Sequence, residues 1–298
     1  MSKMFNWKNF NIRRKITLGF SSIISIALIT GIVLLINLYQ ISTKTGEMVN
    51  THIPSANASN QLMRYWLETS EFMRSYQFSG NEYFHQQHNI TLQRMQNALA
   101  ELQTLTKERD QELQEKGVFI TQLANYTREY QQAAERHHQK RSQFNNELDN
   151  FRTDLDALAG NSAYAGSFTN LQVLNHLHRL NAQLGQGLYE RLDAAEFEKT
   201  LNTLENRLRQ GGGSSTFRAS AEDLMTTGKR LSEDLFDLRK EELKTYEWSK
   251  KVMWEVRASA DIGLDQIILT GNTSNDITMR QRNLQIITLS LSLLLGLL

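Results

Sequence analysis

The stretch ITLGFSSIISIALITGIVLLINLY, residues 16–39, sets the architecture of this protein. No charged residue occurs from Ile16 to Thr43, and a helix of about 20 such residues crosses the hydrocarbon core of a bilayer. A cleaved signal peptide is the alternative, but its apolar region would be only about 7–15 residues long and would end at a small-x-small cleavage site. The residues Asn37–Gln40 offer no such site. We therefore expect an uncleaved transmembrane helix at 16–39.

The residues on either side of this run predict its orientation. The segment 1–15 contains basic residues and no acidic one; these are Lys3, Lys8, Arg13, Arg14 and Lys15. Basic flanks stay in the cytoplasm, so residues 40–284 are expected outside the inner membrane of a bacterium, in the periplasm. A second uncharged run starts at Asn283 and stops with the chain at Leu298. We expect 285–298 to be the beginning of a second transmembrane helix, in the front part of a longer, multi-pass membrane protein.

Composition narrows the class of protein further. The chain has no cysteine and a formal net charge of +1. Because the flank before the first run is purely basic, the rest of the chain is acidic overall, which argues against nucleic acid as a partner. The absence of cysteine excludes disulfides and thiolate ligands. A single proline in 298 residues is far below the average of about 5% and favours long helices.

Helix breakers and apolar spacing predict six helices outside the membrane. The expected segments are 54–79, a helix through His85 and Leu102 that ends near Lys107, a long helix ending at Ala159-Gly160-Asn161, 168–188, a short helix from Phe197 to Leu208, and a helix from Thr216 that continues into the second span. Apolar residues recur every seven positions in the two long helices, as helices packed in bundles require. One such series is Leu123, Tyr130, His137, Phe144, Phe151 and Leu158, and the other is Leu224, Leu231, Leu238, Thr245, Val252 and Ser259.

Helix lengths predict how these segments are arranged. At about 1.5 Å per residue, the two long helices are roughly twice as long as the other four. The short helices can therefore pack only beside one half of the long ones. We expect an all-α protein in which two four-helix bundles are stacked end to end. The membrane-proximal bundle would comprise about 45–135 and 245–284, and the distal bundle about 136–244.

Several short segments resemble those of a known receptor family. Arg13–Phe20, entering the first span, resembles the corresponding segment of bacterial methyl-accepting chemotaxis proteins and sensor kinases. Ile53-Pro54, Phe78–Asn81 and Ile267–Asn272 are similar to elements of their helical bimodular (HBM) sensor domain. The resemblance covers nearly the whole chain, and size, spans and helix order carry most of it. It implies a homodimeric chemoreceptor that binds small organic acids outside the membrane and signals to the cytoplasmic chemotaxis machinery.

The same resemblance directs attention to arginines on the first and last external helices. Guanidinium groups hold carboxylates through paired charge-assisted hydrogen bonds, and bimodular receptors bind organic acids with arginines from these two helices. The candidate ligand-binding residues are Arg64, Arg257 and Arg74, with Tyr65, Trp66 and Trp254 as apolar walls. The competing interpretation is that the arginines pair with surface neighbours, as Arg64 would with Glu68, and that the aromatic residues are core.

Histidines are the other candidates for chemistry. His85 and His88 are three residues apart on one helix face, and His137 lies on the apolar stripe of the next helix. A histidine pair facing a bundle core can bind zinc or sense pH, but buried histidines bonded to neighbours are the favoured interpretation, so no metal and no cofactor are expected. Adjacent residues such as His137 and His138 do not share a helix face. The sequence contains no phosphate-binding loop, HExxH or G-x-S-x-G motif, and we expect no enzymatic activity.

Two other functions remain open at this point. No HAMP linker, methylation helix, signalling hairpin or kinase motif follows the sensor region in these 298 residues. A sensor histidine kinase would carry the same external domain as a chemoreceptor. A structural, membrane-anchored helical protein without a ligand is the third possibility.

Overall fold

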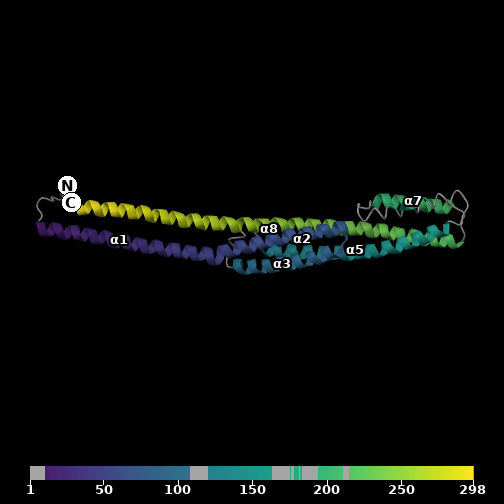
Figure 1. The fold of residues 1–298 in the computed structure, drawn as a ribbon, viewed down its shortest axis with the longest axis horizontal. Coiled ribbons are helices and arrows are strands. Elements are labelled where there is room, and N and C mark those ends of the chain that lie inside the picture. Colours follow the sequence, from purple (N-terminus) through teal and green to yellow (C-terminus); the bar gives the residue numbers. More distant parts are fainter. Residues whose placement is uncertain are drawn as a thin grey trace. The chain divides into compact units, whose positions relative to one another are not determined.

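The protein is all-α, as predicted. The computed structural model describes residues 11–107, 120–162, 175, 178–180, 182, 194–210 and 215–297, and these residues contain no β-strand. The elements, drawn in Figure 1, are α1 (Ile12–Glu47), the π-helical turn η2 (Met48–His52), α2 (Ile53–Ser79), α3 (Glu82–Thr106), α5 (Ile120–Ser162), α7 (Ala194–Gln210) and α8 (Ser215–Leu297). The long helix expected from Thr216 into the second apolar run is therefore continuous. The helix expected at 168–188 lies largely outside the described residues.

The chain divides into two compact units. One comprises Met1–Ala58 and Ala260–Leu298, and the other comprises Ser59–Ser259. Both α2 and α8 pass from one unit into the other without a break. The division into a proximal and a distal bundle stays a prediction, because most of the helix expected at 168–188 is not described.

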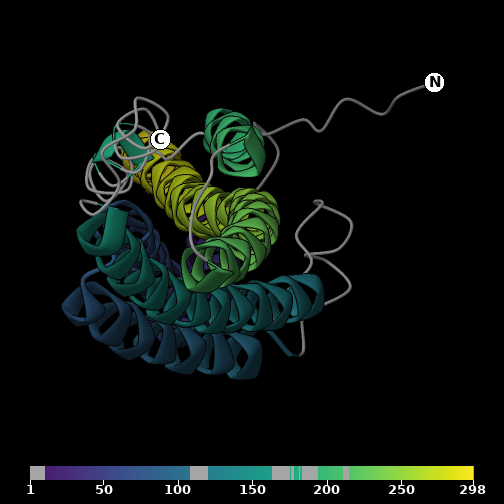
Figure 2. The ribbon, with the colours of Figure 1, turned by 90° about the vertical axis from the view of Figure 1, so that its right-hand side faces the viewer.

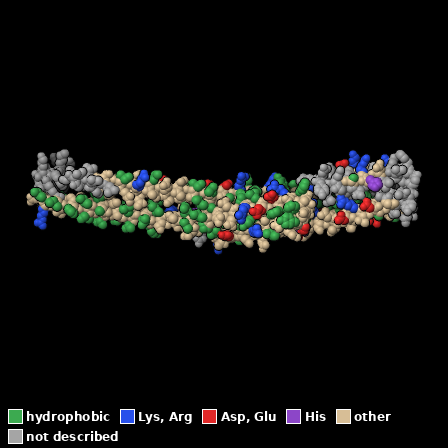
Figure 3. Space-filling model, in the orientation of Figure 1, with side chains coloured by type: hydrophobic (Ala, Val, Ile, Leu, Met, Phe, Trp, Pro, Cys, Tyr) green, Lys and Arg blue, Asp and Glu red, His purple; other side chains and the backbone are tan. Residues whose placement is uncertain are grey.

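The first unit contains the apolar helix α1. Within the described residues, one helix is apolar and long enough to cross a membrane. None of its most apolar stretch is buried in the protein. Figure 3 shows mainly hydrophobic and uncharged side chains along this segment. The end of α8 runs beside α1 in this unit, since Thr30 Oγ1 lies 3.5 Å from Thr288 Oγ1. Near the other edge of the unit, a Cβ added to Gly263 would lie 3.1 Å from Ala56 Cα, so the two helices approach closely there as well.

The start of the helix predicted at 54–79 differs from the prediction. No new helix begins near Pro54; instead, the helix from Ile12 continues through η2 into α2. Proline lacks an N–H group, and its ring clashes with the carbonyl group four residues earlier. The π turn widens the helix immediately before Pro54, with Ile53 N–H bonded to the Met48 carbonyl oxygen. Local widening of this kind is how a long helix accommodates such a disruption.

The turn between α2 and α3 follows the prediction. Gly80 has φ +68°, a left-handed conformation that glycine adopts without steric cost. Its N–H donates to the Tyr76 carbonyl oxygen at 2.7 Å, which closes α2. Asn81 then caps α3 by accepting a hydrogen bond from the Tyr83 N–H at 3.0 Å.

The second unit is held together by the two heptad series. All residues of both series are buried: Leu123, Tyr130, His137, Phe144, Phe151, Leu158, Leu224, Leu231, Leu238, Thr245, Val252 and Ser259. The predicted core positions Phe197, Leu201 and Leu204 of α7 are buried in the same cluster as Phe151 and Leu231. α3 lies along α5 (Figures 1 and 2). α2 contacts α8 through a buried hydrogen bond of 3.1 Å between Ser59 Oγ and Ser259 Oγ.

A half-buried carboxyl group in this unit predicts a pH-dependent stability. Burial, together with the nearby Glu147 carboxyl on α5, raises the pKa of Asp234 on α8 to about 6. A raised folded-state pKa means that the folded protein binds this proton more tightly than the unfolded chain does, so the stabilisation is complete below about pH 4 and is lost as the pH rises through 6. The substitution Asp234→Asn should raise the melting temperature, by an amount that grows between pH 4 and pH 7. Circular dichroism melts of both proteins across this range test it, and a gain that does not vary with pH would contradict it.

Candidate ligand-binding site

A pocket of about 400 Å³ lies between α2 and α8. Its lining residues are Ser70, Met73, Arg74 and Gln77 of α2, Tyr130 of α5, and Thr245, Tyr246, Ser249, Lys250, Met253, Trp254 and Arg257 of α8. The volume falls in the range typical of small-molecule sites, and a mixture of apolar walls and a few polar groups is usual for them. The helical spacing of the lining residues explains the arrangement, because each helix contributes positions three or four residues apart, which share a face.

The charge of this pocket has a single sign. Arg74, Lys250 and Arg257 line it, and none of the described residues that line it is acidic. Arg74 Nε donates to the Ser70 carbonyl oxygen at 3.3 Å, which leaves its other guanidinium donors for a ligand. Arg257 has no hydrogen bond or ion pair with the part of the chain that the structure describes. Unneutralised cations around a concave surface attract a small anion.

Aromatic side chains complete the walls of the pocket. Trp254 is 75% exposed and Tyr246 is 54% exposed, and both project from the face of α8 that carries the cations. Lys250 Nζ lies 4.4 Å from the centroid of the Tyr246 ring, a distance at which cation and ring attract. Tyr130 forms the deep wall and is buried. Burial raises the pKa of Tyr130 above its usual value, and the Arg74 cation opposes that shift, so the phenol stays neutral.

The structure brings together only part of the predicted set. Arg74, Trp254 and Arg257 meet at the pocket, whereas Arg64, Tyr65 and Trp66 do not line it. The Arg64 side chain is 62% exposed and lies 4.0 Å from Glu68, with its guanidinium over the ring of Tyr65. Trp66 is fully buried and packs edge-on against Tyr130, with 4.8 Å between ring centroids. Arg64 therefore lies on the surface beside Glu68, as the competing interpretation predicts, and Trp66 is a core residue.

Sequence reasoning missed Lys250 and Tyr246 as pocket residues. The signal was present in the spacing, because Tyr246, Lys250 and Trp254 follow one another at four-residue intervals toward Arg257. By contrast, Arg64 precedes Arg74 by ten residues, which is about 15 Å along a helix. A search for cations at helical spacing from Arg257 would have found Lys250.

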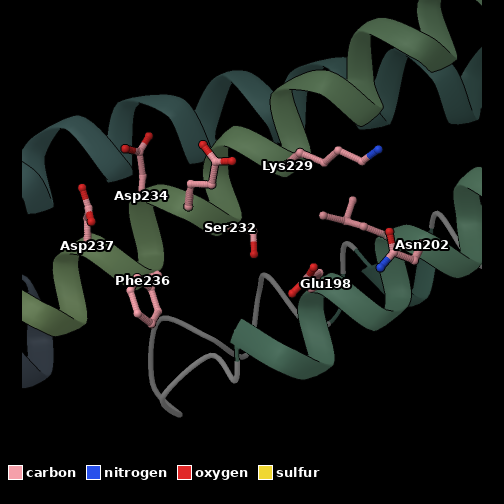
Figure 4. A pocket seen from close by; sticks show the side chains of 9 residues that line it. Glu198, Asn202, Lys229, Ser232, Asp234, Phe236 and Asp237 are labelled. Atoms are coloured by element: carbon pink, nitrogen blue, oxygen red, sulfur yellow. The ribbon is translucent and has the colours of Figure 1, made fainter.

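A second cavity, between α7 and α8, has the opposite character (Figure 4). It has a volume of about 590 Å³, and its labelled walls include Glu198, Asp234 and Asp237, with Lys229 at one end. The three carboxylates repel a small anion. The pocket at Arg74 and Arg257 is therefore the better candidate for binding an organic acid.

A histidine cluster lies at the start of α3 in the same unit. The rings of His85 and His138 stack with 3.7 Å between centroids and 5° between planes. His85 Nδ1 lies 3.2 Å from Glu82 Oε1, and His138 Nδ1 lies 2.8 Å from the Tyr76 hydroxyl. Burial and then the neighbouring His138 lower the pKa of His85. The lowered pKa favours the neutral form of the His85 imidazole, which is the form that coordinates metals.

The other two histidines named as metal candidates lie elsewhere in this core. His88 Nε2 is 3.1 Å from the Tyr130 hydroxyl, and burial lowers the pKa of His88 to about 4. Burial, followed by the Arg141 cation, lowers the pKa of His137 to about 3. His137 Nδ1 has no hydrogen-bond partner among the described residues. The potential ligand atoms that converge belong instead to Glu82, His85 and His138, all within 4.8 Å of one another.

Comparison with known proteins assigns no family to the chain. No family model, no curated protein and no solved structure matches the chain.

Proposed function

We propose that the chain is the sensory part of a transmembrane chemoreceptor that binds a small organic anion between α2 and α8 and has no catalytic activity. The observation that carries the proposal is the pocket lined by Arg74, Lys250 and Arg257 without a described acidic side chain. A guanidinium on each of two helices, with aromatic walls between them, suits a carboxylate with a short carbon chain. The resemblance to receptors with a bimodular sensor domain supports the same ligand class.

The helix that carries most of the pocket also suggests how binding produces a signal. α8 continues without a break from Arg257 to Leu297. An anion that bridges Arg74 on α2 and Arg257 on α8 favours the arrangement of these helices that brings both cations toward it. Ligand binding shifts the population of arrangements only through such a difference in affinity. We propose that α8 carries this displacement toward the membrane and the cytoplasmic chemotaxis machinery.

The proposal includes an inner-membrane location with two spans and a periplasmic sensor region. The apolar helix α1 and its pairing with the end of α8 through Thr30 and Thr288 support two adjacent spans. We further propose a parallel homodimer formed through the first external helix, where Leu67 and Phe78 of α2 are exposed.

Anion binding by the membrane-embedded chain tests this function. Isothermal titration of the full chain in lipid nanodiscs with succinate, acetate, nitrate and ethylamine should show saturable binding of at least one carboxylate. Ethylamine should give no binding, because three cations line the pocket. A protein that binds the amine but neither of the two carboxylates would overturn the assignment.

The proposed topology can be tested by thiol labelling. Because the chain has no cysteine, an introduced thiol is the only one that reacts. Single substitutions Ser2→Cys and Ser142→Cys place one thiol near the N-terminus and one on the exposed surface of α5. With a membrane-impermeant maleimide on cells whose outer membrane is permeabilised, we expect labelling at 142 and none at 2. Labelling at 2 should appear only once the inner membrane is broken. Equal labelling of both thiols in intact spheroplasts would place the two segments on the same side and exclude the proposed topology.

A further inference from the structure

We propose that Glu82, His85 and His138 form a metal site that binds Zn²⁺. The three side chains come from two helices, since Glu82 and His85 lie on the first turn of α3 and His138 lies on α5. One ligand atom from each falls within 4.8 Å of the other two. Two imidazole nitrogens and one carboxylate oxygen are a ligand set that Zn²⁺ accepts together with a water molecule.

The distances from the Glu82 carboxylate to the two imidazole nitrogens are close to those in a zinc site. Zinc–nitrogen and zinc–oxygen bonds of about 2.0–2.2 Å place neighbouring ligand atoms about 3.4 Å apart in a tetrahedral site. His85 Nδ1 and Glu82 Oε1 are 3.2 Å apart, and His138 Nε2 and Glu82 Oε1 are 3.9 Å apart. The stacked rings must tilt so that their lone pairs converge. The Glu82 side chain is 57% exposed, so it can follow the ion and leaves a path for it from solvent.

The second ring nitrogen of His138 is already held by a partner. When His138 Nδ1–H donates to the Tyr76 hydroxyl at 2.8 Å, Nε2 presents a lone pair toward Glu82. Metal-binding histidines are usually oriented in this way by a hydrogen bond to the other nitrogen. Tyr76 belongs to α2, so a bound ion would join α3 to α5 directly and to the end of α2 through this hydrogen bond.

The remaining histidines of the core do not compete for the ion. Both ring nitrogens of His88 already have partners, Asn89 Oδ1 at 3.1 Å and the Tyr130 hydroxyl at 3.1 Å. His137 is buried and its ring lies edge-on to Tyr76, with 6.0 Å between centroids. The site therefore consists of three protein ligands and an open position that faces solvent.

Zinc titration of the full chain tests the site. The protein, without an affinity tag and stripped with EDTA, is titrated with ZnCl₂ in lipid nanodiscs, and bound metal is measured by equilibrium dialysis and elemental analysis. We expect one Zn²⁺ per chain and a higher melting temperature with zinc. Glu82→Gln and His138→Ala should each weaken binding at least 10-fold, in line with the loss of one ligand.

The control variant is His178→Ala, because His178 is an exposed histidine outside the cluster. It should bind zinc as the unmodified protein does. Glu82→Gln changes an exposed side chain, so this variant should still fold. Circular dichroism verifies that both cluster variants are folded, so that a loss of zinc binding reports the loss of a ligand. The proposal is wrong if the unmodified chain binds no zinc at 100-fold excess over protein, if the two cluster variants bind it normally, or if His178→Ala loses it equally.

Discussion

Replacing Trp66 by alanine should lower the free energy of unfolding by about 3–5 kcal/mol, the usual loss when a large buried aromatic side chain is truncated in a core. Trp66 is fully buried, and its ring packs edge-on against Tyr130, so the substitution removes both the buried apolar area and an aromatic pair. The cavity would open beside the wall of the proposed ligand pocket. The prediction therefore separates a packing role for this residue from a ligand-binding one.

The matched control is Trp254→Ala. Trp254 is 75% exposed on α8, and surface substitutions usually change stability by no more than about 0.5 kcal/mol. For a unit of this size, 1 kcal/mol corresponds to about 2–4 °C in melting temperature, so Trp66→Ala should melt on the order of 10 °C lower and Trp254→Ala nearly unchanged. Thermal melts of the full chain, followed by circular dichroism at 222 nm, measure both. Equal melting temperatures for the two variants would show that Trp66 is not the core residue described above.

The burial of Trp66 was foreseeable from its spacing, and so was the all-α character of the described residues. Leu62, Trp66, Met73 and Tyr76 follow a helical stripe, and all four are buried. The seven-residue series of α5 and α8 likewise placed every member in the core. Periodicity predicts which face of a helix is buried because it depends only on the geometry of that helix.

What the sequence could not supply is the register between helices. His138 was set aside because it cannot share a face with the adjacent His137, yet its partner is His85 on α3, with ring centroids 3.7 Å apart. A pairing between helices depends on their axial shift and rotation, which the periodicity of one helix does not fix. The π turn before Pro54 was also missed, because a proline at the start of a helix and a proline after a π turn cannot be distinguished from the sequence.

Arg74→Ala and Arg257→Ala should each weaken carboxylate binding by about 10- to 100-fold. A hydrogen bond to a charged group contributes about 1.5–3 kcal/mol, and each 1.4 kcal/mol is a factor of ten in affinity. Both cations line one pocket, on opposite helices, so the double variant should lose measurable binding of a ligand with micromolar affinity. If the ligand bridges α2 and α8 as proposed, loss of either arginine should also abolish the signal while a weakened affinity is still detectable.

Arg64→Ala is the control that makes this result specific. It removes the same side chain from the same helix α2, but from a position that is 62% exposed, 4.0 Å from Glu68 and outside the pocket. Its affinity for the carboxylate should equal that of the unmodified chain, and so should its response to salt. If Arg64→Ala weakened binding as much as Arg257→Ala does, the anion would be attracted by the general charge of the surface. If neither Arg74→Ala nor Arg257→Ala changed the affinity, the ligand would bind elsewhere, and the bridge between α2 and α8 could not be the origin of the signal.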